Sequence, residues 1–251
     1  MNLFQKLAIP SHDSTYRTVS FGVATTPQEL DSAYRLRYQV YAKKGYIDTN
    51  KYPRKLESDI YDVQKKVVHF IAVLDETVIG YIRIIQDAVL PTEKYFTFAE
   101  PKELQAIARV ERAELGRFII VPPNKEKSDY LPRGLIMLFI LNTLAQYGTQ
   151  NSIVGGYAFV KKSLETKLTK MKMPFIPISL YTEHYPKDGD LLNYFSQPLD
   201  PVIPLCYRTN DFLTYTSKII NKRLIFKKIG EGNYQLRLTL YTKFLRSLKI
   251  I

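Results

Sequence analysis

Several charged side chains occur where the surrounding pattern predicts burial. Arg37 falls on the apolar stripe of a segment with helical periodicity, "RLRYQVYAKKGYI", and Arg83 shares one face of a predicted strand with apolar neighbours. Asp59 and Asp62 stand three residues apart in "ESDIYD", in a loop just before a predicted strand at 66–75. An arginine on a buried face loses hydration worth several kcal/mol unless a carboxylate pairs with it. The four residues could therefore meet and neutralise one another.

A glutamate and a further arginine extend this set. On a regular strand Glu114 and Arg117 of "ERAELGRF" would point to opposite faces, but a β-bulge at Gly116 would turn both to the same side. Mutual pairing would satisfy all of these charges. The alternative is that the stem of Arg37 packs while its guanidinium reaches solvent, and that the two aspartates are solvated turn residues. We favour a polar cluster on a sheet, with a functional role.

The elements that would position these residues alternate between strands and helices. A capping box, with Thr26 as N-cap, Pro27 at N1 and Glu29 at N3, begins a helix that ends at Gly45. The run "LIMLFIL" is apolar all round, which predicts a helix buried against a sheet. The order predicts an α/β (α+β) mixed, mostly antiparallel sheet flanked by helices on both faces. Strands are expected at 16–25, 66–75, 77–85, 111–121, 152–160, 175–180 and 202–208, and two further helices at 132–148 and 161–171.

Length and composition limit the classes of protein. The 251 residues suit one large domain with an appendage, and a single cysteine, Cys206, excludes an intramolecular disulfide. Residues 1–10 do not read as a secretory signal, and the longest apolar run, 134–141, falls short of the ~20 residues that span a bilayer. We therefore expect a cytoplasmic protein.

The positive charge is concentrated near the C-terminus. Net charge is +12, and residues 213–251 hold nine lysines and arginines against one acid, Glu231. We divide the chain into a domain at 1–215 and a basic extension at 216–251, which makes nucleic acid an unlikely partner for the main domain. The extension could lie on an anionic membrane or pack on the domain. A predicted helix near its end places four apolar residues on one face: Leu240, Phe244, Leu248 and Ile251.

Four motifs in order resemble a known group of enzymes. They are "RYQVY" (37–41), "ESDIYD" (57–62), "GYIR" (80–83) and "ELGRF" (114–118). The order of the motifs resembles that of the acyl-homoserine-lactone synthases. The residues within the motifs more closely resemble those of the N-acyl amino acid synthases and the exosortase-associated acyltransferases, which also belong to the GNAT superfamily. The resemblance implies a GNAT-like fold. It also implies transfer of a long-chain acyl group from acyl carrier protein to the amine of an amino acid or similar small molecule.

The resemblance assigns roles to residues of this sequence. It makes Glu114 the candidate base, and it leaves open whether the arginines hold the acceptor's carboxylate or only brace the aspartates. The chain has no tryptophan, and Tyr46 stands near a tryptophan of the lactone synthases, which argues against a homoserine-lactone product. The expected catalytic residues are Glu114, Arg117 and Arg83. The expected substrate-binding residues are Arg37, Tyr41, Tyr46, Asp59, Asp62 and Phe118.

The donor is also predicted from the sequence. The GNAT phosphate loop, Q/R-x-x-G-x-G/A, would lie within "NKEKSDYLPRGLIM" (124–137), which lacks it. This favours the acyl-phosphopantetheine of acyl carrier protein over acyl-CoA, with no permanently bound cofactor and no metal site. Five basic residues could dock an acidic carrier protein: Lys125, Lys127, Arg133, Lys161 and Lys162.

Two other functions remain open at this point. The first is an acyl-CoA-dependent GNAT acetyl- or acyltransferase. The second is a non-enzymatic nucleic-acid-binding or scaffold protein that uses the basic extension. Cys206 and His69 are interpreted as core residues, so an acyl-cysteine intermediate is a minor alternative.

Overall fold

A computed structural model describes residues 1–10, 15–121 and 133–237. Its main feature is a ten-stranded sheet in the order β11-β12-β1-β2-β3-β4-β6-β7-β10-β8. The β1–β12 and β6–β7 pairs are parallel, and the other neighbours are antiparallel. The strands are β1 (Asn2–Pro10), β2 (Tyr16–Val23), β3 (Val67–Leu74), β4 (Thr77–Ile85), β6 (Arg112–Ile120), β7 (Gly155–Lys161), β8 (Phe175–Pro177), β10 (Val202–Arg208), β11 (Phe226–Gly230) and β12 (Asn233–Leu236).

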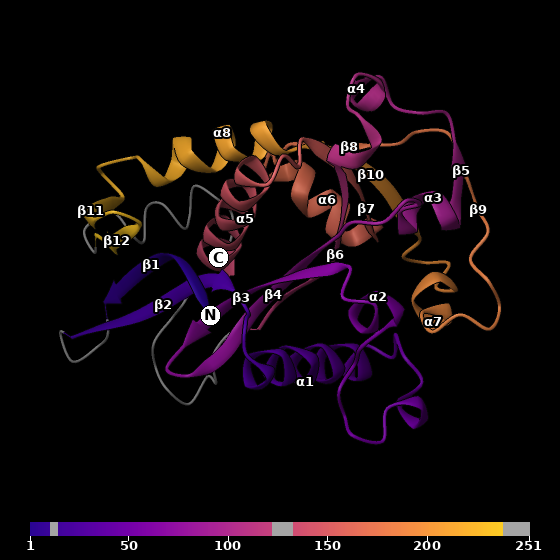
Figure 1. Ribbon diagram of the computed structural model, residues 1–251, viewed down its shortest axis with the longest axis horizontal. Coiled ribbons are helices and arrows are strands. Elements are labelled where there is room, and N and C mark those ends of the chain that lie inside the picture. Colours follow the sequence, from indigo (N-terminus) through magenta and orange to yellow (C-terminus); the bar gives the residue numbers. More distant parts are fainter. Residues whose placement is uncertain (11–14, 122–132, 238–251) are drawn as a thin grey trace.

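Helices cover both faces of this sheet, as predicted (Figure 1). On one face α1 packs Ala33, Leu36 and Tyr41 against Ile71 and Tyr81 of the sheet. On the other face lies α5, which is buried around nearly its whole circumference, with α8 beside it. The helices are α1 (Pro27–Lys43), α2 (Ile60–Val63), α3 (Pro91–Tyr95), α4 (Lys102–Gln105), α5 (Arg133–Gln150), α6 (Lys162–Lys170), α7 (Leu192–Phe195) and α8 (Thr209–Ile220). A small second sheet pairs β5 (Phe96–Phe98) with β9 (Tyr181–Glu183).

Both ends of α1 follow the sequence signals. Thr26 accepts a hydrogen bond from the Glu29 N–H, and the Glu29 side chain bonds back to the Thr26 N–H, so the predicted capping box is confirmed. After the C-cap residue Lys44, Gly45 adopts a φ of 66°, which favours glycine and stops the helix. Arg37 is therefore held on the buried side of a well-defined helix.

Strands β6 and β7 diverge halfway along their length. Their pairing runs from Arg112 opposite Gly155 to Leu115 opposite Ala158 and then ends. Beyond that point β6 continues beside β4, while β7 continues to Lys161 beside β10. A Cβ on Gly156 would lie 1.8 Å from the Ala113 carbonyl oxygen, so only glycine allows the strands to meet closely before they separate. The separation makes room for a pocket.

The C-terminal part differs from the predicted division of the chain. The boundary placed after residue 215 falls inside α8, and β12 joins the main sheet through β1. Ile220 of α8, Phe226 of β11 and Leu236 of β12 are buried in the same core as α5. This part of the chain therefore belongs to the main domain. The predicted helix with Leu240, Phe244, Leu248 and Ile251 lies outside the described residues. Within the described ranges, no helix is long and apolar enough to cross a membrane.

Candidate active site

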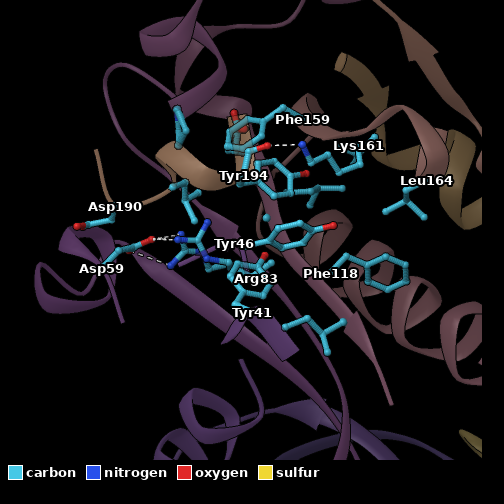
Figure 2. Close-up of a pocket in the computed structure, with 18 of the residues that line it drawn as sticks. Tyr41, Tyr46, Asp59, Arg83, Phe118, Phe159, Lys161, Leu164, Asp190 and Tyr194 are labelled. Atoms are coloured by element: carbon cyan, nitrogen blue, oxygen red, sulfur yellow. Dashed lines mark hydrogen bonds and ion pairs between the residues drawn. The ribbon is translucent and has the colours of Figure 1, made fainter. Parts of the chain in front are cut away.

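Three arginines and three carboxylates form one buried network. Arg37 pairs with Glu57 and, at 2.9 Å, with Asp62. Arg83 pairs with Asp59 and, at 2.9 Å, with Asp62. Arg117 lies 3.0 Å from both Glu57 and Asp59, so each acid serves two arginines. The charges balance, and Figure 2 shows the Asp59–Arg83 contact at the edge of a pocket.

Burial and pairing act in opposite directions on the acids of this network. Arg37 and Glu57 have no exposed side-chain surface. Burial acts to raise the pKa of Glu57, but Arg117 and Arg37 outweigh it and lower that pKa to about 2. Burial likewise opposes Arg83 and Arg117 at Asp59, and the pKa of Asp59 is lowered. All three arginines thus face ionised partners, and the prediction that Arg37 is buried and paired is confirmed.

Glu57 belongs to this network but was not among the site residues predicted from the sequence. It is the first letter of the quoted motif "ESDIYD", so the signal was present in the sequence. A glutamate in a loop carries no periodicity that would mark it as buried. Its role emerges only when the loop folds over β6 and brings it between Arg37 and Arg117.

The predicted β-bulge is present beside Gly116. Tyr81 of β4 pairs with Ile119, and Arg83 pairs with Gly116, which leaves one extra residue on β6. Arg117, rather than the glycine, takes the left-handed conformation, with a φ of 60°. The bulge lets Glu114 and Arg117 line the same pocket, as expected.

Glu114 does not join the ion-pair network. Its side chain is almost fully buried, and its carboxylate accepts hydrogen bonds from the Thr92 N–H at 3.1 Å and the Thr92 hydroxyl at 2.8 Å. No charged nitrogen of the described residues lies within 4 Å of it. Burial raises the pKa of Glu114 to about 8, although both bonds from Thr92 oppose the shift. Thr92, at the start of α3, was not predicted, because no motif marks it.

The pocket between the diverging strands encloses about 310 Å³. Tyr41, Tyr46 and Phe118 line it, as does Tyr194, which the sequence analysis missed. Tyr46 meets Tyr41 and Tyr194 edge-on, with ring centres 5.7 and 4.9 Å apart. Tyr95 and Tyr185 add to this aromatic wall. Asp59, Arg83 and Arg117 reach the pocket, whereas Arg37 and Asp62 lie behind it and do not line it.

The predicted docking residues separate into three groups. Lys161 is buried, and its ammonium group donates to the backbone carbonyls of Tyr194 and Asp200, so its assignment to an exposed docking surface was wrong. Arg133 and Lys162 are exposed, and Lys162 pairs with Glu165. Lys125 and Lys127 lie outside the described residues.

Cys206 and His69 occupy core positions. Burial raises the pKa of the Cys206 thiol to about 11, which keeps it protonated and unreactive. Burial also lowers the pKa of His69 to about 4. The neutral ring then accepts a hydrogen bond at Nδ1 from the Tyr81 hydroxyl, 2.8 Å away, while that hydroxyl accepts one from Arg37. No group of three metal-ligating side chains occurs in the part of the chain that the structure describes.

Comparison with known proteins identifies a related family and a shared fold. Residues 32–154 match the family model of the N-acyl amino acid synthase FeeM. No curated protein sequence matches the chain.

Solved structures of acyl-homoserine-lactone synthases share the fold at low sequence identity. The AHL synthase LasI is 18% identical with a TM-score of 0.53, and the match covers 76% of this chain and 89% of LasI. The CoA-dependent synthase MesI is 16% identical with a TM-score of 0.53, over 79% and 94% of the two chains. The CoA-dependent synthase BjaI is 14% identical with a TM-score of 0.55, over 89% and 97%.

The matched segment begins in α1 and ends just before β7, so it includes the charged network, Glu114 and the bulge. The sheet and its two helical layers are those expected for a GNAT-like protein. The chain therefore has a GNAT-like fold, and its residues 32–154 resemble the N-acyl amino acid synthases, which indicates an acyltransferase.

Proposed function

We propose that the protein transfers a long-chain acyl group from acyl carrier protein to the amine of an amino acid or similar small molecule. The observation that carries this proposal is Glu114, an unpaired buried carboxyl at the wall of the pocket between β6 and β7. It lies within the segment that matches the N-acyl amino acid synthase model. Such a group suits proton transfer, because a base is most effective when its pKa is near the working pH.

The reaction requires a base because an amino acid's amine is mostly protonated near pH 7. In the proposed step the amine nitrogen bonds to the thioester carbonyl carbon, and the carbon–sulfur bond breaks. Glu114 first takes one proton from the ammonium form, directly or through one water, and the second proton that the nitrogen loses after its attack passes to the leaving thiolate, which departs as the thiol. Backbone N–H groups at the bulge beside Gly116 are candidates to polarise the carbonyl.

The arginines act mainly as a brace in this proposal. Arg37 does not line the pocket, so it cannot touch an acceptor there. Arg83 and Arg117 do line it, but each guanidinium is already bonded to two carboxylates. An acceptor's carboxylate would have to displace an existing ion pair to bind either one.

The acyl chain has an apolar path beside the pocket. A smaller cavity of about 30 Å³ adjoins it and shares Leu115, Phe118 and Val160 with its wall. Gly116 and Arg117 also line this cavity, and its other residues are apolar: Ile82, Leu141, Ala158, Phe159, Leu164, Leu168 and Phe175. Burial of each additional methylene of a chain there would contribute roughly 0.8 kcal/mol.

The donor is the part of the proposal that most needs a direct comparison. Exposed lysines on α6, among them Lys162, Lys167 and Lys170, offer an acidic carrier protein a complementary surface. MesI and BjaI are described as CoA-dependent, which supports acyl-CoA as the alternative.

The test uses the purified full chain with one fatty acyl group presented on acyl carrier protein and on CoA. Each donor is mixed with the twenty amino acids, and products are read by mass spectrometry. We expect N-acyl amino acids, formed faster from the carrier protein. Faster transfer from CoA would overturn the donor assignment alone. Absence of any N-acyl product with either donor would overturn the proposed function.

We also propose peripheral contact with anionic membrane near β11. Lys218, Lys222, Arg223, Lys227 and Lys228 are exposed and lack a carboxylate partner among the described residues, and Leu224 and Ile229 are exposed beside them. We expect the full chain to sediment with anionic vesicles and the double variant Lys227→Glu, Lys228→Glu to do so less. Equal sedimentation would overturn this contact.

A further inference from the structure

Lys161 is a buried cation without a counter-ion among the described residues. It is the last residue of β7, its relative exposure is 4%, and it lines the pocket. Its ammonium group donates to the carbonyl oxygen of Tyr194 and, at 2.8 Å, to that of Asp200 (Figure 2 shows the Tyr194 contact). No carboxylate of the described residues lies within 4 Å of it. The nearby carboxylate of Asp200 bonds instead to the N–H and hydroxyl of Ser163, at 2.7 and 2.8 Å.

This arrangement leaves binding capacity unused. An ammonium group has three donors, and two of them reach backbone carbonyls. The rings of Tyr194 and Tyr46, centred 4.7 and 5.9 Å from Nζ, offset part of the lost hydration. Burial lowers the pKa of Lys161, and the charges of Asp200 and Glu183, which act to raise it, do not outweigh burial. A buried charge at a pocket wall calls for an ionic partner from outside the chain.

The contrast with the arginines identifies where that partner would come from. Arg83 and Arg117 also line the pocket, but both are neutralised by Asp59 and the other acids of the network. Lys44, the remaining lysine of the pocket wall, is exposed to solvent. Lys161 is thus the buried cation of the described pocket wall that an anionic ligand can approach without breaking an existing ion pair.

We propose that Lys161 binds the carboxylate of the acceptor, so that the enzyme selects amino acids over simple amines. This inference rests on the proposed function and names the group that recognises its substrate class. Along β7, Lys161 follows Tyr157, the partner of Glu114, by four residues, so the two backbones are separated by roughly 13 Å along the strand. Both side chains reach into the pocket, and one water between the amine and Glu114 would let an amino acid engage both ends.

The kinetic test compares matched acceptors that differ only in the carboxylate. The pairs are alanine and ethylamine, leucine and 3-methylbutylamine, and phenylalanine and 2-phenylethylamine. For the full chain carrying Lys161→Met, we expect kcat/KM for the amino acids to fall about 10- to 100-fold, mainly through KM, because a hydrogen bond to a charged group is lost. We expect kcat/KM for the amines to change less than about threefold. The control variant Lys6→Met removes an exposed lysine of β1 that does not line the pocket, and both values should stay unchanged.

Equal losses for amino acids and amines would overturn the proposal, because they would show that Lys161 only holds Tyr194 and Asp200 in place. A second measurement needs neither turnover nor a folded variant. Calorimetric titration of the wild-type chain with 4-methylpentanoate and with 4-methylpentanamide compares a carboxylate with a neutral group of the same shape. We expect the acid to bind at least tenfold more tightly, and equal binding would also overturn the proposal. Failure of all acceptors to react would count against the proposed function, while this titration would still show whether the pocket prefers a carboxylate, as the role of Lys161 requires.

Discussion

Two sets of buried charges in this protein are treated in opposite ways. In the network of Arg37, Arg83 and Arg117 with Glu57, Asp59 and Asp62, every charge has a partner, and the sum is zero. Glu114 and Lys161 are equally buried and line the neighbouring pocket, yet neither has an opposite charge within 4 Å among the described residues. The pKa values follow this division, because pairing lowers that of Glu57 to about 2 and burial raises that of Glu114 to about 8.

This difference separates residues with a structural role from residues that can react with or bind a substrate. A balanced network holds α1, the loop before β3 and strands β4 and β6 together, and its arginines keep the pKa values of Glu57 and Asp59 lowered. An unpaired carboxyl and an unpaired ammonium group are the ones able to take a proton or an anion. We therefore assign the proton transfer and the carboxylate site to Glu114 and Lys161, and the alignment of the pocket to the network.

The largest effect is expected when the unpaired carboxyl is removed. Glu114→Gln keeps the shape and an acceptor for Thr92 but cannot take a proton, so we expect kcat to fall about 10²- to 10⁴-fold. The measurement is single-turnover acyl transfer with a saturating acceptor. The matched control is Glu111→Gln, an acid immediately before β6 that does not line the pocket. A kcat of the Glu114→Gln enzyme within threefold of the wild-type value would contradict the assignment of proton transfer to the unpaired carboxyl.

The same variant has an opposite effect on stability. Because the folded-state pKa of Glu114 is raised above its ordinary 4.5, the folded protein binds the extra proton between about pH 4.5 and 8. Its free energy of unfolding therefore falls as pH rises through this range, and the full penalty is present above pH 8. Glu114→Gln removes this penalty, so we expect the variant to be more stable than the wild type by up to about 4 kcal/mol at pH 9 and by little at pH 4.5. Urea denaturation at both pH values measures this.

The next effect concerns the paired set and appears in stability. Arg37→Met leaves Glu57 and Asp62 with fewer cations in a buried site, so we expect a loss of about 3–5 kcal/mol in the free energy of unfolding. Arg35→Met, an exposed position on the same helix, is the control and should change it by less than about 0.5 kcal/mol. Equal stability of the two variants would show that the network is not a brace.

A smaller and more specific effect is expected at Thr92. Its hydroxyl stabilises the ionised form of Glu114, so Thr92→Val should raise the pKa of that carboxyl further, by about one unit. The ratio of variant to wild-type kcat/KM should then be about 0.1 at pH 7 and return towards one as pH rises well above 8. The ratio cancels the ionisation of the acceptor's own amine. Thr92→Ser, which keeps the hydroxyl, should leave the ratio near one, and a pH-independent loss in Thr92→Val would indicate a packing role only.

The smallest effect is expected at the bulge. Gly116 has no positive φ, and a Cβ there would meet its nearest neighbour, Nε of Arg83, at 3.5 Å, an ordinary contact. Gly116→Ala should change the free energy of unfolding by less than about 1 kcal/mol. Gly156→Ala provides the contrast, because its Cβ would overlap the Ala113 carbonyl, and we expect it to disrupt the β6–β7 pairing. Thermal unfolding of both variants distinguishes them, and a large loss at Gly116 would show that the bulge needs glycine.

Sequence patterns were informative where a residue's neighbours in the chain determine its surroundings. The stripe on α1 predicted the burial of Arg37, and the alternation on β4 predicted that of Arg83. The burial of Lys161, which was expected to dock a carrier protein, was not predicted, since its partners, the carbonyls of Tyr194 and Asp200, are more than thirty residues away. Strand β1 was missed because its stability comes from pairing with β2 and β12, and β12 lies at the other end of the chain. Long-range contacts of this kind leave no local signal.

The most direct test of the division between paired and unpaired charges is the titration of Glu114 itself. In protein labelled with carbon-13 at the glutamate side-chain carboxyls, the Glu114 signal is assigned by its loss in Glu114→Gln and followed by NMR as pH changes. We expect a midpoint near 8 for Glu114, because it is buried without a paired cation. We expect Glu57 to be still ionised at pH 4, because it is buried between two arginines. A midpoint for Glu114 below 5 would contradict the assignment of this carboxyl as the poised base.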